Sequence, residues 1–313
     1  MPSVKERICT DLTVPADLVE GALRMAYIRY RKTRVPKRSG GYRTIIQPAS
    51  ELKLIQGWLL ENVFSKMPIS TVATAFELGS SIVKNATAHK DTAYSVRVDV
   101  EDFFPSITST DLHRVLSAAG TLVPAWVTEP DCIQLISKAC FDRSGRLPIG
   151  YPSSPKIANV VMFRFDEQLV RIVSSDSERF GHGVNVTRYA DDFVFSTNRR
   201  GACREFIDAI RNLMSSTDSP KMRLNESKTR FMSRARGSTL ITGLRVNGQG
   251  VVGVHPNYRD HVRLLVKLYA HGKLRSDDVQ KLRGHLAFIE HADPRLFTRL
   301  SFKYFDKIAA LRA

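Results

Sequence analysis

The sequence predicts an α+β fold in which an antiparallel β-sheet is backed by helices and followed by a helical C-terminal segment. Two runs of β-branched and aromatic residues, at 96–100 and 186–196, predict strands of the sheet, and each run carries aspartates near a strand end. A third observation predicts the helical segment, because residues 255–313 follow the period of amphipathic helices almost throughout. Strands and helices that are segregated along a chain in this way are typical of the α+β class.

The aspartates near the strand ends are the first candidates for chemistry. The run Val186–Ser196 breaks at Ala190, which predicts two short strands joined by a tight turn with Asp191 and Asp192 at its tip. Successive side chains on a strand face opposite ways, so we rank Asp191 above Asp192. Asp99 adds a third carboxylate at the end of another strand. Carboxylates from two adjacent strand ends predict a site for hard divalent cations such as Mg²⁺.

The composition predicts a polyanionic partner, although solubility alone is an alternative explanation. The 313 residues carry a formal net charge of +16, and Lys and Arg neutralise phosphates and release their counterions. The four cysteines include no Cys-x-x-Cys pair, which predicts neither a zinc site nor a disulfide framework. No apolar run approaches the roughly 18 residues that span a bilayer. We therefore expect a soluble, cytoplasmic protein with no membrane partner.

The first 64 residues predict a helix, a basic hairpin and a second helix. Apolar residues at helical spacing predict the helices over 17–30 and 51–64. Between them, 35–48 predicts two strands around a Gly-Gly turn. The basic residues of this hairpin are Lys37, Arg38 and Arg43. A guanidinium presents a bidentate fork to phosphate, so we expect the hairpin to close on a nucleoside triphosphate.

The rest of the chain alternates helices, loops and strands. Helices are predicted at 109–119, 132–141 and 202–214. The Gly/Pro-rich loop Leu147–Asn159 leads into a further helix. A strand over Leu240–Gly248 enters an Asn-Gly turn and returns at Val251–Val254. Three C-terminal helices are predicted, with breaks near 271–272 and at 292–294.

Tyr189-Ala190-Asp191-Asp192, preceded by Asp99-x-x-x-Phe103-Phe104, resembles the catalytic core of reverse transcriptases, and the similarity continues in order over most of the chain. The resemblance implies a right-hand polymerase fold with fingers, an antiparallel-sheet palm and a three-helix thumb. The implied division is an N-terminal helix and fingers at 1–95, a palm at 96–254 with an interleaved fingers segment at about 109–150, and a helical thumb at 255–313.

The resemblance implies an RNA-directed DNA polymerase that uses two Mg²⁺ ions. Asp99, Asp191 and Asp192 are the implied catalytic ligands, and the Val100 carbonyl is a further one. In this chemistry a primer hydroxyl attacks the α-phosphate of a deoxynucleoside triphosphate.

Several residues match positions that bind the incoming nucleotide in the family. The implied set is Lys37, Arg43, Phe104, Ile149, Gly150 and Lys228. Phe104 matches the aromatic gate that excludes a ribose 2′-hydroxyl, with a pair of core aromatics at 103–104 as the alternative. Lys228 lies in a Leu-Asn-x-x-Lys-Thr motif, and an exposed turn lysine is the alternative there. Ile149 departs from the usual Gln, so fidelity or nucleotide affinity is expected to differ.

Two short motifs are similar to retron reverse transcriptases, the bacterial enzymes that copy part of a dedicated structured RNA. Asn85-Ala-x-x-His89 matches one signature, and Ile241-Thr242-Gly243 matches a Val-Thr-Gly segment with one conservative change. RNA-binding roles for Asn85, His89, Thr242 and Gly243 are implied by this resemblance.

The retron resemblance also implies a product and partners. The product is a branched, RNA-linked single-stranded DNA (msDNA) that is primed from a guanosine 2′-hydroxyl of a cognate non-coding RNA. The implied context is anti-phage defence alongside an effector protein. The chain has no room for an RNase H domain, so we expect a host RNase H to remove the template.

Two alternatives remain open from the sequence. The first is another bacterial reverse transcriptase, such as a group II intron-like, CRISPR-associated or diversity-generating one. The second is a non-catalytic RNA-binding scaffold with the same fold, against which the intact acids argue. An Asp-Asp pair alone is weak evidence, since the pair at 277–278 is predicted to lie in the first turn of a helix.

Overall fold

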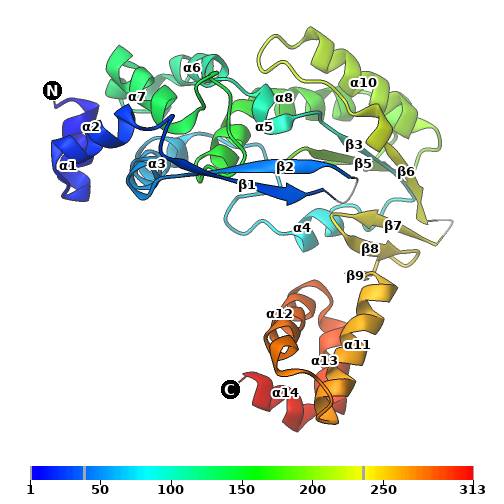
Figure 1. Ribbon diagram of the computed structural model, residues 1–313. Helices are drawn as coiled ribbons and strands as arrows, with labels where there is room; N and C mark the ends of the chain where they lie inside the picture. Colours follow the sequence, from blue (N-terminus) through cyan, green and yellow to red (C-terminus); the bar gives the residue numbers. More distant parts are fainter. Residues whose placement is uncertain (1, 38–39, 235–236, 313) are drawn as a thin grey trace.

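The computed structural model describes residues 2–37, 40–234 and 237–312, so Arg38 and Ser39 of the predicted hairpin lie outside the described residues. A central β-sheet carries helices on one side, and a long hairpin passes in front of it (Figure 1). A helical bundle follows at the C-terminal end of the chain, beyond a second, smaller sheet.

The central sheet has the strand order β4-β5-β3-β6. In the middle, β3 (Tyr94–Asp99) pairs antiparallel with β5 (Asp192–Thr197) and with β6 (Arg230–Ser233), and β4 (Asn185–Tyr189) pairs with β5. The predicted break at Ala190 is confirmed as a tight turn in which Ala190 has a φ of 57°. The antiparallel sheet that the strand patterns predicted is therefore present.

Two long helices, α8 (Ser154–Ser175) and α10 (Ala202–Ser216), cover one face of the central sheet (Figure 1). The rings of Phe165 and Phe193 pack edge to face, and Phe195 stacks on Phe206 with ring centroids 4.6 Å apart. All four side chains are buried. Each fully buried side chain of this kind contributes about 1.5–3 kcal/mol, so this interface anchors the strands that carry the aspartates.

The N-terminal region contains a helix that the sequence analysis did not predict, α1 (Val4–Leu12), whose Ser3-x-x-Glu6 capping box marks its start. The predicted helix over 17–30 is wrong at its C-terminal end, because α2 (Ala16–Arg24) stops earlier and residues 25–29 form turns. After the last buried residue of this stretch, Ala26, the chain turns away to begin a strand.

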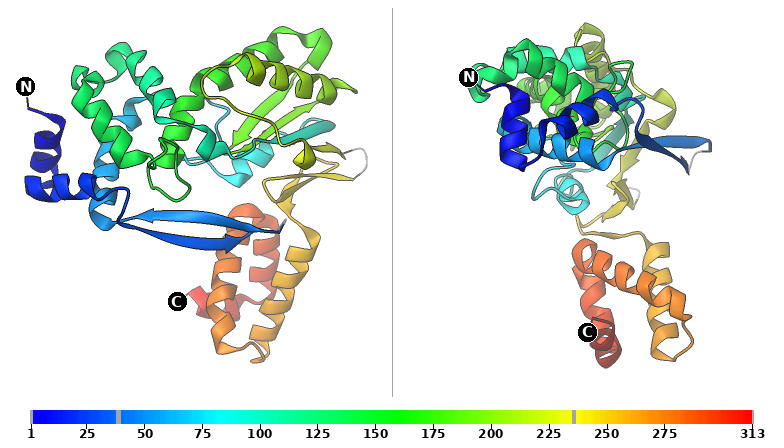
Figure 2. Two further views of the ribbon diagram at one scale, coloured as in Figure 1. Left: turned by 45° about the horizontal axis from the view of Figure 1, so that its top comes forward. Right: turned by 60° about the vertical axis from the view of Figure 1, so that its left-hand side comes forward.

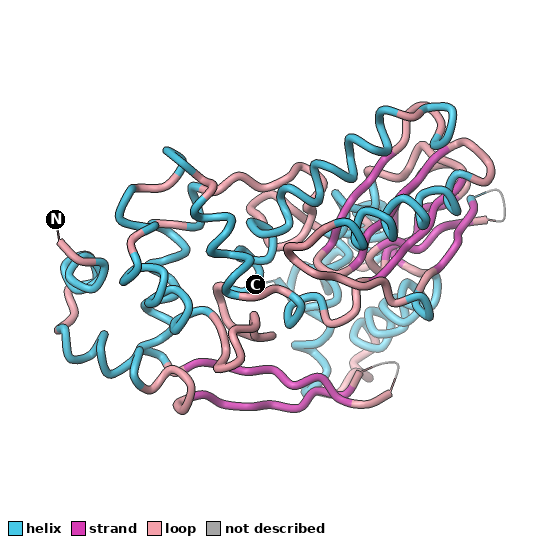
Figure 3. The backbone as a smooth tube through the Cα atoms, turned by 90° about the horizontal axis from the view of Figure 1, so that it is seen from above, coloured by secondary structure: helices cyan, strands magenta, loops and turns pink. Residues whose placement is uncertain are grey.

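The predicted basic hairpin is confirmed and is longer than expected. It consists of β1 (Tyr30–Pro36) and β2 (Tyr42–Pro48), and every residue of β1 is exposed. Figures 2 and 3 show the hairpin as a separate ribbon that projects away from the neighbouring helices. Its base continues into α3 (Ser50–Asn62), which was predicted, and the short η1 (Phe64–Lys66).

The chain between β3 and β4 is mostly helical. Its shorter elements are α5 (Phe103–Ser106), α6 (Ser109–Ser117), η2 (Gly120–Leu122), η3 (Ala125–Thr128), α7 (Pro130–Cys140) and α9 (Ser177–Phe180). The predicted cap of α6 is Thr108, which forms a capping box with Asp111. Before β3, α4 (Ile82–Thr87) lies against the sheet face opposite α8 and α10 (Figure 1).

The second sheet is a three-stranded meander of β7 (Ser238–Ile241), β8 (Leu244–Asn247) and β9 (Val252–Val254). The prediction of one strand over 240–248 is wrong. Thr242 and Gly243 have φ values of 45° and 82°, and two positive φ angles in succession form a two-residue hairpin turn. The return strand at 252–254 is confirmed.

The C-terminal bundle contains α11 (Pro256–Ala270), α12 (Ser276–Ala292), α13 (Pro294–Lys303) and α14 (Phe305–Arg312). Both predicted breaks are present, and a further break at Tyr304 divides the last predicted helix in two. Its buried core, which includes Val262 and Leu286, is continuous with that of the second sheet. Within the described part of the chain, no helix is long and apolar enough to cross a bilayer.

Candidate active site

Three aspartates meet at one end of the central sheet. The register of β3 and β5 sets Asp99 directly opposite Asp192, and Asp191 lies in the turn just before β5. Side chains directly opposite on antiparallel strands share one face, with Cβ atoms about 5 Å apart. The Val100 N–H donates a hydrogen bond of 2.9 Å to the Asp191 carbonyl, which ties the turn to the end of β3. Asp192, rather than the higher-ranked Asp191, is thus the register partner of Asp99.

A segment after α10 closes the site beside β3. The Asn225 N–H donates to the Asp99 carbonyl at 2.8 Å, and the Glu101 N–H donates to the Arg223 carbonyl at 2.9 Å. These backbone bonds position η4 (Glu226–Lys228), so that the Lys228 ammonium lies 2.9 Å from both carboxylate oxygens of Asp99. The Lys228 side chain is 47% exposed. The ion pair is therefore accessible to solvent and to any phosphate that enters the site.

Burial and neighbouring negative charges raise the pKa values of Asp191 and Asp192. Burial raises the pKa of Asp192 to about 6, against the opposing effect of Arg97, and the charges of Asp191 and Asp99 add to the rise. Burial also raises the pKa of Asp191, and the charge of Asp99 contributes further. Packing like charges into a partly buried site costs stability, and a bound cation relieves that cost.

The aspartates at this end of the sheet offer carboxylate oxygens, which are the donor atoms that a hard divalent cation prefers. Over residues 2–37, 40–234 and 237–312, no three His, Cys, Asp or Glu side chains converge closely enough to hold a metal ion. Lys228 instead holds Asp99, and Arg97 lies 3.8 Å from Asp192. The ammonium on Asp99 is a cation bound by both oxygens of a carboxylate, which is the environment that oxygen-seeking divalent ions prefer. Metal ligation by the three aspartates and the Val100 carbonyl remains a prediction.

The loop at Ile149 and Gly150 packs directly on the hairpin. The Ile46 N–H donates to the Ile149 carbonyl at 2.8 Å. Gly150 has a φ of +107°, and a Cβ at this position would lie 2.7 Å from the Ile46 carbonyl oxygen, so only glycine fits. Arg43 is two residues before Ile45 on β2. Burial raises the pKa of Asp191, and the positive charge of Arg43 is among the effects that oppose this rise. The loop and the hairpin are therefore joined, and Arg43 of the hairpin lies close enough to Asp191 for their charges to interact. Lys37 is exposed near the tip of the hairpin.

Comparison with known proteins identifies the family. A profile described as reverse transcriptase (RNA-dependent DNA polymerase) matches residues 35–269. The chain belongs to the reverse transcriptase family. The retron Ec73 reverse transcriptase of Escherichia coli is 37% identical over 89% of this chain and 88% of its own length. The retron Ec86 reverse transcriptase of the same species is 32% identical over 90% of this chain and 82% of its own length.

The retron relatives extend to another genus. The retron Mx162 reverse transcriptase of Myxococcus xanthus is 32% identical over 85% of this chain and 58% of its own length. Together these relatives make the chain a retron-type reverse transcriptase, an RNA-directed DNA polymerase. A structure of apo telomerase from Candida tropicalis shares the fold with a TM-score of 0.50 and 11% identity, over 91% of this chain and 58% of that one. The predicted right-hand polymerase fold is confirmed.

Phe104, the predicted gate of this reverse transcriptase, lies in α5 just beyond β3 and is partly buried. Its ring packs edge to face on Phe103, with centroids 5.4 Å apart. Phe103 is 3% exposed and belongs to the core, whereas Phe104 is only partly buried. The nucleotide-binding roles of Phe104 and Lys228 stay predictions.

The two retron-like motifs of the reverse transcriptase meet in space, but the side chains of Asn85 and His89 are buried. Asn85 accepts a hydrogen bond from Thr74 and donates one of 3.4 Å to the Thr242 hydroxyl. The His89 ring pairs with Ser196 at 2.6 Å and with Thr187 at 2.8 Å. Direct RNA contact by Asn85 and His89 does not fit this placement, because their polar groups are satisfied inside the protein. Gly243 alone of the four is exposed.

The buried position of His89 predicts a pH effect on stability. Burial lowers its pKa to about 4, whereas an unfolded histidine titrates near 6.5. The unfolded state therefore binds more protons between these values, so stability is lost as pH falls from about 6.5 to about 4. The wild-type chain should lose up to about 3 kcal/mol more than His89→Gln over this range. Urea unfolding at pH 7 and pH 4.5 measures it, with His271→Gln, at an exposed position, as the control.

An equal pH dependence of unfolding in the wild-type and His89→Gln proteins would show that His89 is protonated without cost in the folded state. Such a result would place the ring at the surface, where RNA could reach it.

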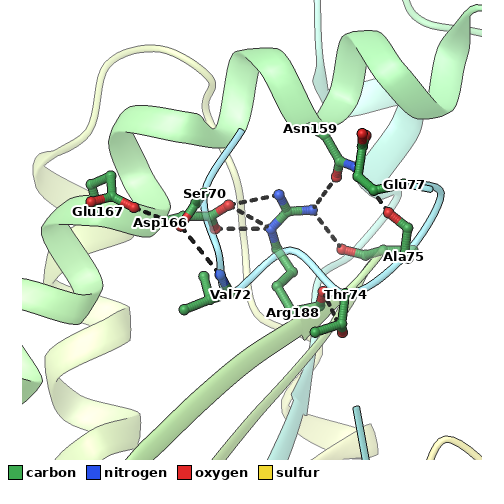
Figure 4. A network of polar contacts seen from close by, with 10 residues as sticks. Ser70, Val72, Thr74, Ala75, Glu77, Asn159, Asp166, Glu167 and Arg188 are labelled. Carbon is green, nitrogen blue, oxygen red and sulfur yellow. Dashed lines mark hydrogen bonds and ion pairs between the residues drawn. The ribbon is translucent and has the colours of Figure 1, made fainter. Parts of the chain in front are cut away.

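A buried ion pair beside the catalytic turn was missed by the sequence analysis. Arg188 of β4 donates to both carboxylate oxygens of Asp166 of α8, at distances down to 2.6 Å, and both side chains are fully buried (Figure 4). Its Nη1 also donates to the Asn159 side chain at 3.1 Å and to the Ala190 carbonyl at 3.4 Å. The second of these bonds reaches the turn that carries Asp191. The sequence does contain a signal for this pair, because an arginine in an otherwise apolar strand requires a buried partner.

Proposed function

We propose that this reverse transcriptase copies a cognate structured non-coding RNA into msDNA, a branched single-stranded DNA linked to RNA. Synthesis is primed from a guanosine 2′-hydroxyl, and the enzyme acts with an effector protein in anti-phage defence. The observation that carries the proposal is the identity of 37% with a retron reverse transcriptase over 89% of the chain. The net charge of +16 supports a nucleic-acid partner. A host RNase H would then remove the copied RNA.

We further propose that Asp99, Asp191 and Asp192 hold two Mg²⁺ ions, with the Val100 carbonyl as an additional ligand. Bound ions would activate the priming hydroxyl and offset charge on the phosphates. Lys228 pairs with Asp99 in the structure, and it would pair with the phosphates of the incoming deoxynucleoside triphosphate if Asp99 held a metal ion instead. The geometry that supports this step is the half-exposed position of Lys228.

The remaining residues position the nucleotide and the RNA. Lys37 and Arg43, which lie on the hairpin, hold the triphosphate of the incoming nucleotide. Ile149 and Gly150 line the pocket for the base of that nucleotide. Gly243 and Thr242 contact the cognate RNA at the exposed turn between β7 and β8. Asn85 supports that turn through its hydrogen bond to Thr242, and His89 fixes α4 against the sheet.

The retron assignment is tested on nucleic acid that co-purifies with the protein from cells carrying its native locus. We expect a DNA whose 5′ end is joined to RNA through a 2′,5′-linkage, so that ribonuclease leaves a short ribonucleotide remnant and a debranching enzyme removes it. The Asp191→Asn protein should co-purify with the RNA alone. DNA without any covalently attached RNA would reject the branched product while leaving the polymerase assignment intact.

The gate is tested by shortening its ring. Phe104→Ala should raise ribonucleotide incorporation by about ten-fold or more, since the alanine no longer collides with the 2′-hydroxyl, and a ten-fold change in kcat/KM corresponds to about 1.4 kcal/mol. Single-nucleotide extension with matched deoxy- and ribonucleotides measures the ratio. An unchanged ratio would assign Phe104 to packing alone.

A further inference from the structure

The segment before α4 runs along the free edge of the central sheet, next to the catalytic turn. Arg188 of β4 accepts a backbone hydrogen bond of 2.8 Å from Thr74 and donates one of 2.7 Å to Val72. Ala73 forms a parallel bridge with the same arginine. The segment therefore extends the sheet for a short stretch beside β4, and it carries Phe76 to the edge of the site.

The backbone at Phe76 is unusual. Its φ is 67°, in the left-handed region that aromatic residues rarely adopt. Such a conformation costs free energy and persists only where the surroundings enforce it. The ring is nevertheless 50% exposed, so burial of the side chain does not account for the conformation.

A polar clamp holds the chain on both sides of Phe76. Asn159 of α8, which is 1% exposed, donates 2.9 Å and 3.0 Å hydrogen bonds to the Ala75 carbonyl and to Glu77 (Figure 4). Lys156, one turn earlier on α8, donates to Glu77 at 3.0 Å. Asn159 is itself oriented by Arg188. The clamp therefore fixes Phe76 relative to both α8 and the catalytic turn.

The clamped ring faces the aromatic residues of the site. Its centroid lies 6.2 Å from that of Phe104 and 6.5 Å from that of Tyr189, in tilted arrangements. Phe103 contacts Phe104 as well, at 5.4 Å. The Phe104 ring is thus held between a core residue and a half-exposed residue from a strained segment. Without Phe76, Phe104 would have free space next to it.

We propose that Phe76 is a specificity-determining positioning residue, which fixes the Phe104 ring and thereby sets the preference for deoxynucleotides over ribonucleotides. The inference rests on the proposed role of Phe104 as the gate. Phe76 acts through Phe104, so its contribution should disappear when that ring is absent. The free energy of one aromatic contact of this kind corresponds to roughly a 2- to 12-fold change in an equilibrium constant.

The test is a double-mutant cycle on the full-length protein. Phe76→Ala, Phe104→Ala and the double variant are compared by single-nucleotide extension of a primer–template, with kcat and KM measured separately for deoxy- and ribonucleotides. Phe76→Ala should lower the deoxy/ribo ratio of kcat/KM by roughly 2- to 12-fold, mainly through a lower KM for ribonucleotides. The double variant should match Phe104→Ala. The control is Leu78→Ala in the same segment, because Leu78 is fully exposed.

Each outcome decides between the two proposals. A normal ratio in Phe76→Ala, alongside an altered ratio in Phe104→Ala, overturns the role of Phe76 and leaves the gate standing. Additive effects in the double variant overturn it too, because they show action independent of Phe104. An unchanged deoxy/ribo ratio in Phe104→Ala overturns the proposed role of Phe104 as the gate. If Phe76→Ala does not fold, Phe76→Leu retains bulk without the ring, and an unaltered ratio there overturns the proposal.

Discussion

Asp191→Asn should abolish deoxynucleotide incorporation and leave RNA binding unchanged. The substitution keeps the size of the side chain but removes the anionic oxygen that is proposed to hold the metal ions. Metal stabilisation of the transferring phosphate is worth several kcal/mol, so we expect a loss of at least roughly a thousand-fold in kcat. Primer extension at saturating nucleotide measures the loss, and a filter-binding titration measures RNA affinity.

The substitution should not destabilise the protein. Burial raises the pKa of Asp191 and the charge of Asp99 adds to the rise, so folding disfavours the charged form of this side chain. A neutral amide removes that repulsion, and the free energy of unfolding should stay the same or increase. The matched control is Asp277→Asn, which changes the exposed first aspartate of an Asp-Asp pair in the first turn of α12 and should keep full activity. Retained synthesis by Asp191→Asn would exclude a ligand role for this carboxylate.

The carboxylate site was predictable because its signals are local. A strand pattern locates Asp99 at a strand end, and the break at Ala190 locates Asp191 and Asp192 in a turn. Two antiparallel neighbours then bring the acids together, which the register confirms. The split of the strand over 240–248 was not predictable in the same way, because Thr242 is β-branched and residues of that type rarely adopt a positive φ.

Long-range polar pairing could not be predicted from the sequence alone. Asn85 and His89 look like surface groups in the sequence, and only the tertiary structure shows their distant partners. Thr242 bonds Asn85, and Ser196 and Thr187 bond His89, from about a hundred or more residues away. Phe76 shows no local pattern at all, since its position follows from a side chain on α8. These positions depend on tertiary contacts, which strand and helix periodicity do not encode.

The buried Arg188–Asp166 pair should be the most costly polar contact in the protein to break. Burial raises the pKa of Asp166, and the Arg188 guanidinium opposes that rise, so the arginine stabilises the ionised carboxylate. Arg188→Met leaves Asp166 in the interior without a counter-ion, and we expect it to lower the free energy of unfolding by about 3–5 kcal/mol. The control is Arg211→Met, because Arg211 pairs with two carboxylates at the surface, and the expected loss there is at most about 1 kcal/mol.

The double variant Arg188→Met/Asp166→Leu separates charge from geometry. Removing both charges should recover most of the stability, because hydrophobic replacements of a buried ion pair are often neutral. The free energy of unfolding should remain about 1–3 kcal/mol below that of the wild type, because the side-chain oxygen of Asn159 loses its hydrogen-bond donor and remains buried. Activity should stay low in the double variant even where its stability is recovered. The guanidinium that bonds the Ala190 carbonyl and Asn159 is missing, so the catalytic turn and the Phe76 clamp lose the group that positions them. Urea unfolding and primer extension on the same samples measure both quantities, and full recovery of activity with stability would confine Arg188 to a structural role.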